Sequence, residues 1–417
     1  MSKKRVVITG MGAITPIGNN LKEYNQSLFN GISGCKPITR FDASKFKTRF
    51  ACELKNYDPL NYFDKKESRK MDAFAQYGLI VAEEALQDSG IDLNKIDKNK
   101  FGVIWGSGVG GIETFQNELI NFSENNKNPR FNPFFIPKLI PDICPGLISI
   151  KYGLKGPNFA TVSACASASN AIIDSFNYIK SGTSDIIITG GSEAAVNETG
   201  IGGFNALKAL SERNDSPETA SRPFDKKRDG FVLGEGGGGL ILENYDHAIK
   251  RNAKIYAEII GFGMSCDAHH ITAPHPDGEG AKLVMNNAIN HANIKKEEID
   301  YINVHGTSTP LGDKSEILAI ENVFNEHAYN VNISSTKSMT GHLLGAAGAI
   351  ESIASIISIN EGSVPPTINH FNNDEEFSPK LNLTLNKIQK RDINIAISNT
   401  FGFGGHNTSI IFKKINL

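Results

Sequence analysis

The stretch "TVSACASASNAII", residues 161–173, joins a short apolar run to a helical pattern, and Cys165 stands at the junction. We expect a strand that ends near Ser163 and a helix that begins near Cys165. The thiol would then lie at a helix N-terminus, where the helix dipole and the free N–H groups favour the thiolate. The alternative is a buried, unreactive thiol, because free cysteine often packs as a small hydrophobic side chain.

Further short apolar runs, most of them ending in glycine or serine, occur along the whole chain. They lie at 5–12, 101–111, 159–165, 184–193 and 236–244, and then at 254–263, 299–309, 331–342, 393–405 and 406–414. Such runs are typical of strands in sheets that are covered on both faces. The two series match in order and character, which predicts an internal duplication with halves at 1–253 and 254–417.

Helical patterns separate these runs. They lie at 69–90, 166–182, 280–294, 313–324 and 345–362. The alternation of strands and helices predicts a layered α/β protein. Residues 112–158 are polar and carry several prolines, so we expect an insertion or cap there.

The composition of the 417 residues excludes several classes of protein. A formal net charge of −2 gives no support for nucleic-acid binding, and no apolar run is long enough for membrane insertion. The five cysteines are scattered and form no CxxC pair, which favours a reducing compartment and gives no support for a metal site. We expect a cytoplasmic protein; a plastid stroma location after loss of a transit peptide is the alternative.

Two histidines lie in loops rich in Gly, Ser and Thr at the ends of expected strands. His305 lies in "VHGTSTPLGD", and His342 lies with Lys337 in "SSTKSMTGHLLGAAGAIE". Strand-end loops of open α/β sheets converge on ligand sites, so both histidines are candidate partners for Cys165. The histidines and cysteine of segment 266–275 show no regular ligand spacing, and we predict no metal there.

Four motifs together resemble one family of enzymes. "TVSACASA", "HGTSTPLGD", "STKSMTGHLLGAAGAIE" and "SNTFGFGGHN" are similar to motifs of the β-ketoacyl-acyl-carrier-protein synthases, most of all the elongating type II enzymes. The resemblance extends over nearly the full chain. It implies a thiolase-like αβαβα layered sandwich built from two duplicated halves, a homodimer, and acyl carrier protein as the partner.

The reaction implied by the resemblance is a decarboxylative Claisen condensation in type II fatty acid elongation. Malonyl-carrier protein reacts with an enzyme-bound acyl chain to give the 3-oxoacyl product. A polyketide-type ketosynthase with the same mechanism is the alternative. No cofactor is implied, because the release of CO₂ drives carbon–carbon bond formation.

The resemblance also assigns roles to residues. Cys165 would take the acyl chain, and His305 and His342 would hold the malonyl carbonyl and assist the loss of CO₂. The N–H groups of Cys165 and Phe403 would form the oxyanion hole. Lys337 would tune the charge near His342, paired with Glu351; a purely structural ion pair is the alternative.

Substrate contacts are assigned in the same way. Thr307 and Thr309 match positions that bind the pantetheine arm, and Phe231 matches an aromatic wall of the acyl tunnel. In "SGVGGIE", residues 107–113, either Val109 or Ile112 would shape the tunnel end.

The segment "NTFGFGGHN", residues 399–407, would form a gate beside Cys165. Gly402, Gly404 and Gly405 permit backbone shapes that other residues avoid, and Phe403 would swing to open the tunnel. The alternative is a glycine turn with a core aromatic residue. His406 departs from the threonine that many relatives carry.

A basic cluster lies in "NYFDKKESRKMDAF", residues 61–74. Asp64 and Glu67 resemble a capping box, which predicts a helix from Lys65. Relatives dock acidic carrier proteins here. The candidates for docking are Lys66, Arg69 and Lys70, with Lys208 and Arg130 as further ones; a solvated basic face is the alternative.

Four other classes of protein compete with this interpretation. A thiolase would need a second active-site cysteine, and none follows Cys266. A chain-initiating synthase would carry a Cys-His-Asn set, against which His342 argues. A non-catalytic chain-length factor would lack Cys165. A hydrolytic cysteine enzyme would lack the second histidine that decarboxylation uses.

Overall fold

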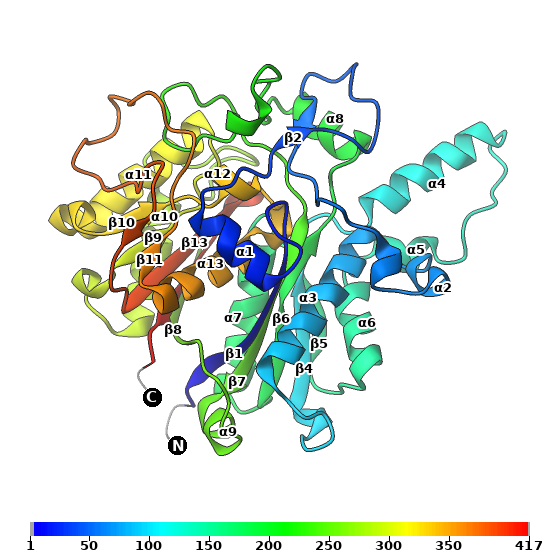
Figure 1. Ribbon diagram of the computed structural model, residues 1–417, viewed down its shortest axis with the longest axis horizontal. Helices are drawn as coiled ribbons and strands as arrows, with labels where there is room; N and C mark the ends of the chain where they lie inside the picture. Colours follow the sequence, from blue (N-terminus) through cyan, green and yellow to red (C-terminus); the bar gives the residue numbers. More distant parts are fainter. Residues whose placement is uncertain (1–3, 416–417) are drawn as a thin grey trace.

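The structure, a computed structural model, describes residues 4–415. All ten expected strand segments lie in one ten-stranded sheet, in the order β10-β9-β13-β14-β8-β1-β7-β6-β4-β5 (Figure 1). The strands span Val6–Ile14 (β1), Phe101–Gly106 (β4), Asn158–Thr161 (β5), Ile186–Glu193 (β6), Gly236–Asn244 (β7), Ala257–Cys266 (β8), Tyr301–Asn303 (β9), Asn332–Ser334 (β10), Ile395–Gly402 (β13) and His406–Lys413 (β14). Two small ribbons, Lys36–Pro37 with Phe50–Ala51 (β2, β3) and Ser363–Val364 with Gln389–Lys390 (β11, β12), complete the strands.

The two halves of this sheet have the same strand order. From the outer edge inward they run β5-β4-β6-β7-β1 and β10-β9-β13-β14-β8. In each half the first three strands are parallel and the next two pairings are antiparallel. β1 and β8 pair antiparallel and join the halves. The division of the chain at residues 253 and 254 stays a prediction.

Helices cover both faces of the sheet and fill the space between its halves. They span Leu21–Phe29 (α1), Lys65–Ser68 (α2), Ala73–Ser89 (α3), Ile112–Glu124 (α4), Phe135–Leu139 (α5), Ile143–Tyr152 (α6), Ser167–Lys180 (α7), Glu198–Ala206 (α8), Tyr245–Lys250 (α9), Glu279–Ala292 (α10), Pro310–Phe324 (α11), Lys337–Thr340 (α12) and Ala347–Glu361 (α13). α7 and α13 contact strands of both halves, α3 and α6 cover one outer face, and α10 and α11 cover the other (Figure 1). The predicted αβαβα sandwich is therefore confirmed, with its two β layers hydrogen-bonded into one continuous sheet.

The helix start predicted at Lys65 and the helical pattern predicted at 69–90 belong to two separate helices, α2 and α3. Asp64 accepts hydrogen bonds from the N–H groups of Lys66 and Glu67 and so caps the short α2. Asp72 then has an extended backbone, and its carboxylate accepts the N–H of Phe74, which starts α3. The end at Gly90 is as expected, because this residue has a φ of 63°.

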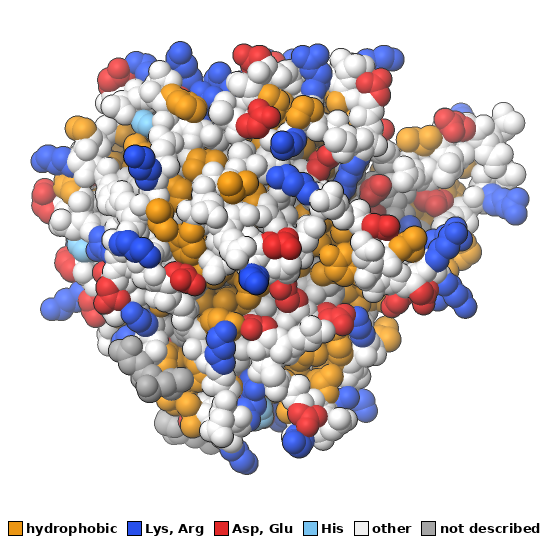
Figure 2. Space-filling view, viewed as in Figure 1, with side chains coloured by type: hydrophobic (Ala, Val, Ile, Leu, Met, Phe, Trp, Pro, Cys, Tyr) orange, Lys and Arg blue, Asp and Glu red, His pale blue; other side chains and the backbone are white. Residues whose placement is uncertain are grey.

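The expected insertion is only partly separate from the body. α4 projects from the rest of the molecule, whereas α6 packs on α3 and β4 in the outer layer (Figure 1). On the face drawn in Figure 2, Lys, Arg, Asp and Glu side chains are spread among hydrophobic ones. Within residues 4–415, none of the helices is long and apolar enough to cross a membrane.

Candidate active site

Cys165 lies in a tight turn between β5 and α7. β5 ends at Thr161 and α7 begins at Ser167, so the strand ends earlier and the helix begins later than predicted. The residues between β5 and α7 reverse the direction of the chain. Ala164 takes a left-handed φ of 50°, and the Ser167 hydroxyl donates a hydrogen bond to the Ala164 carbonyl at 2.7 Å. The turn directs the Cys165 side chain into a cavity.

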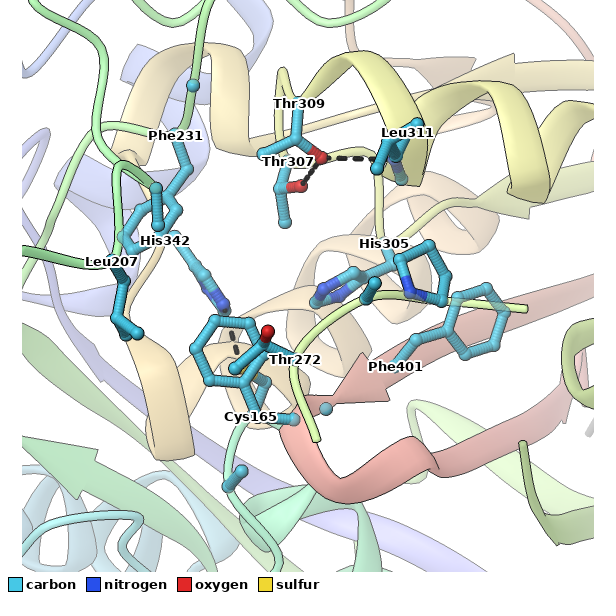
Figure 3. A pocket seen from close by; sticks show the side chains of 18 of the residues that line it. Cys165, Leu207, Phe231, Thr272, His305, Thr307, Thr309, Leu311, His342 and Phe401 are labelled. Carbon is cyan, nitrogen blue, oxygen red and sulfur yellow. Dashed lines mark hydrogen bonds between the residues drawn. The ribbon is translucent and has the colours of Figure 1, made fainter. Parts of the chain in front are cut away.

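This cavity has a volume of about 560 Å³ and draws its lining from both halves of the chain (Figure 3). Cys165, His305 and His342 lie together in it. Its other side chains are mostly apolar, and they include Val109, Phe204, Leu207, Phe231, Leu344, Phe401 and Phe403. The site is therefore a largely apolar pocket with a few converging polar groups, as ligand sites commonly are.

The two histidines and the cysteine are in direct reach of one another. The Nε2 atom of His342 lies 3.0 Å from the Sγ atom of Cys165. The rings of His305 and His342 have centroids 5.2 Å apart and are nearly perpendicular, at 86°. The fold therefore brings together the cysteine and the two histidines that the sequence marks as candidate partners.

Backbone hydrogen bonds hold both histidines. The N–H of His342 donates to the carbonyl of Val232 at 2.8 Å, and its own carbonyl accepts from Gly234 at 3.0 Å. The N–H of His305 donates to the buried carboxylate of Glu316 at 2.9 Å. The Nδ1 atoms of both rings lack a hydrogen-bond partner among the described residues. Among those residues, no hydrogen bond at Nδ1 therefore fixes the tautomer of either ring.

Burial sets the protonation of these groups. It raises the pKa of the Cys165 thiol to about 12, against the opposing effects of the Lys337 charge and the Phe403 N–H. Desolvation therefore opposes the effect expected of the helix dipole and leaves the thiol protonated at neutral pH. Burial and the charge of Lys337 hold the pKa of both His305 and His342 well below the usual value, so the imidazoles are neutral.

Lys337 and Glu351 form a buried ion pair behind the histidines. Their side chains are 1% and 0% exposed, and the Lys337 Nζ atom bonds to Glu351 Oε1. Burial raises the pKa of Glu351 to about 7, and the Lys337 charge opposes this shift. The expected pairing is thus present, and the charge of Lys337 acts on Cys165, His305 and His342.

The proposed substrate contacts line the cavity. The hydroxyls of Thr307 and Thr309 are 3.0 Å apart, and Thr309 also caps α11. Phe231 packs edge-to-face on His342, with ring centroids 5.4 Å apart. Val109 lines the cavity, whereas Ile112 packs behind it in the cluster that holds Phe231.

The gate segment passes directly beside the cysteine. A Cβ atom on Gly402 would lie 3.0 Å from the Cys165 nitrogen, while its φ of −117° is ordinary. Gly402 is therefore needed for space and not for an unusual backbone shape, which corrects the expectation. Gly404 has a φ of 83° and does need that freedom. Phe403 lines the cavity, and the ring of His406 lies against Gly404.

The basic residues expected to dock a carrier protein lie outside the cavity. Lys66, Arg69 and Lys70 are exposed around α2, and Lys70 lies over the ring of Phe134, 5.7 Å from its centroid. Of the two further candidates, Lys208 lines the cavity and Arg130 is exposed.

Sequence reasoning missed several residues of the site. Phe401 lies beside His305, with ring centroids 5.8 Å apart, and its place two residues before Phe403 was the available signal. The Glu316 carboxylate accepts hydrogen bonds from the N–H groups of His305 and Gly306. In the sequence, nothing distinguishes Glu316 from an ordinary residue of a helix. Glu193 gave no signal either, because a carboxylate at a strand end is usually solvated.

Only one group in the described chain could hold a metal ion with three side chains. It consists of Cys165, His305 and His342, whose ligand atoms all lie within 4.8 Å of one another.

Comparisons with known proteins agree on one family. Residues 3–248 match the model of the β-ketoacyl synthase N-terminal domain, and residues 256–371 match that of the C-terminal domain. The chain is 47% identical over 415 residues to a Synechocystis protein named 3-oxoacyl-[acyl-carrier-protein] synthase 2, covering 99% of both chains. It is 48% identical over 412 residues to the Staphylococcus aureus protein of that name, covering 99% of this chain and 98% of the relative.

Two solved structures have the same fold over the full length of both chains. The ishigamide ketosynthase/chain length factor superposes with a TM-score of 0.92 at 32% identity. A type II polyketide ketosynthase, solved in complex with its acyl-carrier protein and bound to the hexaketide, superposes with a TM-score of 0.88 at 31% identity.

Proposed function

This chain belongs to the β-ketoacyl synthase family, and from that premise we propose that it is an acyltransferase of the 3-oxoacyl-acyl-carrier-protein synthase II type. It condenses malonyl-carrier protein with an enzyme-bound acyl chain in type II fatty acid elongation. One observation carries the proposal: Cys165 contacts His342, with His305 beside it, at a largely apolar cavity of about 560 Å³.

The first step is transfer of the acyl chain to Cys165. Because burial keeps the thiol protonated, His342 Nε2, at 3.0 Å, takes the proton as the sulfur attacks the thioester carbonyl. The N–H groups of Cys165 and Phe403 stabilise the oxyanion of the tetrahedral intermediate. Its collapse releases the carrier thiolate, which takes the proton back from His342.

The second step is decarboxylation of the malonyl group. For this step the proton of the neutral His342 ring moves from Nδ1 to Nε2, because a neutral imidazole carries only one N–H. The two neutral imidazoles then donate hydrogen bonds to the malonyl thioester carbonyl, so the negative charge that develops on its oxygen is stabilised. Loss of CO₂ leaves a carbanion that attacks the acyl carbonyl on Cys165. The Cys165 thiolate leaves, and it takes up a proton to restore the resting thiol.

The other residues would position the substrates. Thr307 and Thr309 would bind the pantetheine arm at the cavity mouth, and Phe231 would form an aromatic wall. Phe403 would move with the glycines at 402 and 404 to open the acyl tunnel. Lys337, paired with Glu351, would keep both histidines neutral.

The fatty acid reaction is favoured over a polyketide reaction by the comparisons. The relatives named 3-oxoacyl-[acyl-carrier-protein] synthase 2 are 47% and 48% identical, whereas the type II polyketide ketosynthase is 31% identical and the ishigamide ketosynthase/chain length factor is 32% identical. We keep the polyketide reaction as the second candidate, because its ketosynthases share the fold over their full length.

Two kinds of partner belong to the proposal. The first is acyl carrier protein, docked by Lys66, Arg69 and Lys70; a ketosynthase of the same fold binds such a protein. The second is another copy of this chain. β5 is an edge strand, and Val162 and Ile150 beside it are 60% and 77% exposed, which a homodimer would cover. The cytoplasmic location and the two halves at 1–253 and 254–417 stay predictions.

Mass spectrometry of the protein with acyl-carrier thioesters, followed by malonyl-carrier protein, tests the proposal. We expect an acyl adduct on Cys165 alone among the cysteines, and then a 3-oxoacyl product two carbons longer. An adduct that persists in Cys165→Ala, or a product of unchanged length, would contradict the proposed function.

A further inference from the structure

Glu193, at the end of β6, is a fully buried carboxylate that none of the steps above uses. Its two oxygens accept five hydrogen bonds, four from backbone N–H groups and one from a hydroxyl. The donors are the nitrogens of Gly108 at 2.7 Å, Val109 at 3.1 Å, Gly110 at 3.2 Å and Gly345 at 3.0 Å, and the Ser107 hydroxyl at 3.1 Å. Because every partner is a donor, the surroundings suit a carboxylate, which only accepts.

These donors belong to two segments that are far apart in the chain. Residues 107–110 follow β4 in the first half, and Gly345 lies in the second half, three residues after His342. Each segment carries an apolar side chain that lines the cavity: Val109 in the first and Leu344 in the second. One carboxylate therefore joins two parts of the cavity wall.

The junction leaves no space and holds a strained residue. A Cβ atom on Gly345 would lie 2.2 Å from the nitrogen of Gly108, so the two backbones are in contact. Leu344 has a φ of 47°, in the left-handed region that a branched side chain avoids. Such a conformation persists only where its surroundings impose it, and the next N–H is the one bonded to Glu193.

We propose that Glu193 is a positioning residue that sets the acyl-chain-length preference, because it holds Val109 and Leu344 in the cavity wall. This inference rests on the proposed function, since it concerns the same acyl chain on Cys165. Short acyl chains end before the wall and make no contact with these two side chains. For chains that reach the wall, kcat/KM depends on the positions of the Val109 and Leu344 side chains.

The substitution Glu193→Gln tests the inference with little change in size. It replaces one acceptor oxygen with an amide donor, so at least one backbone N–H faces another donor. We expect kcat/KM for acyl chains that reach the wall to fall about tenfold relative to short chains, the lower end of the effect of one methylene in an apolar pocket. A purely structural role predicts an equal loss for all chain lengths.

Glu243 provides a matched control. It is also fully buried, and it lies at the other end of the same β6–β7 pairing, opposite Ile186, where Arg251 and His247 bind it. Glu243→Gln should lower the melting temperature without changing the ratio of long-chain to short-chain kcat/KM.

Amide hydrogen exchange gives a second measurement that needs no activity. In Glu193→Gln, peptides that cover 107–110 and 344–346 should exchange faster together, and in Glu243→Gln they should not. Unchanged exchange, or a chain-length ratio that is unchanged or raised, would overturn the inference. If wild-type protein forms no acyl adduct, the proposed function fails by itself, and exchange alone then decides whether Glu193 holds the two segments.

Discussion

The Nε2 atom of His342 lies 3.0 Å from the Sγ atom of Cys165, although 177 positions separate these residues in the chain. The ligand atoms of His305 and Cys165 lie within 4.8 Å of one another, and the His305 ring faces the His342 ring edge to face. The two histidines are thus not equivalent: one is placed to move the thiol proton, and both are placed to bind the malonyl carbonyl.

The two histidine variants should therefore differ. We expect His305→Ala to lose malonyl decarboxylation by about 10²–10⁴-fold while acylation of Cys165 stays near the wild-type rate, because His342 remains as the base. His342→Ala should lose both steps. Single-turnover acylation, followed by mass, and release of CO₂ separate the steps. Equal acylation rates in the two variants would remove His342 from the first step.

The charge of Lys337 should be visible in a pH profile. Burial and then this charge hold the pKa of both histidines well below 6.5, so they are neutral in the wild type at that pH, and decarboxylation should lose activity only at lower pH. In Lys337→Met combined with Glu351→Gln, which leaves no unpaired buried charge, both histidine pKa values rise. The acid limb of the decarboxylation rate should then move to higher pH. A limb at the wild-type pH would make the ion pair purely structural.

The same double variant should also affect Cys165. The Lys337 charge lowers the pKa of this thiol more than the Glu351 charge raises it, so loss of both charges raises that pKa and decreases the thiolate fraction at any given pH. We expect slower alkylation by iodoacetamide near pH 8, with a rate that still increases at higher pH. Alkylation of Cys165 as fast as in the wild type would show that burial alone sets the reactivity.

Gly402 should tolerate no side chain. The added Cβ atom of Gly402→Ala would lie 3.0 Å from both the Cys165 nitrogen and the Ser163 carbonyl, so the turn that carries the thiol has to shift. We expect a destabilisation of about 1–3 kcal/mol in denaturant unfolding and slower acylation. Gly203 is the control, because a Cβ there meets nothing within 4 Å. Equal effects of the two substitutions would contradict this explanation.

Phe403 should control the order of the substrates if it closes the tunnel. In Phe403→Ala the side chain no longer separates the acyl tunnel from the malonyl site. We expect enzyme that carries no acyl group to decarboxylate malonyl-carrier protein faster than the wild type does. Decarboxylation by Phe403→Ala at the wild-type rate would contradict the proposal that Phe403 closes the tunnel.

The basic residues near α2 should matter only for carrier-bound substrates. Arg69→Glu with Lys70→Glu should raise KM for acyl-carrier protein and leave acylation by a free pantetheine thioester unchanged, because the effect is electrostatic attraction during encounter. Added salt should weaken the wild-type carrier reaction, since exposed charges are screened over about 10 Å at 0.1 M.

The control for this pair carries the same charge change on another surface. Lys387 and Lys390 are exposed and do not line the cavity, so Lys387→Glu with Lys390→Glu should leave the ratio of carrier-bound to free-pantetheine activity unchanged. If both double variants lower that ratio equally, the cluster around α2 has no special role.

Much of the fold could be predicted from the sequence because the signals are local. Continuous apolar runs predicted all ten strands of the sheet. The second series of runs repeats the first in the same order along the chain, which predicted two similar halves. The break between α2 and α3 was missed, since it depends on one side chain: Asp72 caps α3 and also binds Thr114 from a distant segment.

By itself, the sequence determined the layered α/β class and the three residues at the centre of the site, because residue type and position at a strand end are local properties. Only the tertiary structure decided the protonation states of those residues and the contacts between them. The 3.0 Å contact between His342 and Cys165, the protonated thiol, and the Glu193 carboxylate behind Val109 and Leu344 all depend on burial among segments from both halves. Desolvation and distance arise when those segments pack together, so no window of sequence contains them.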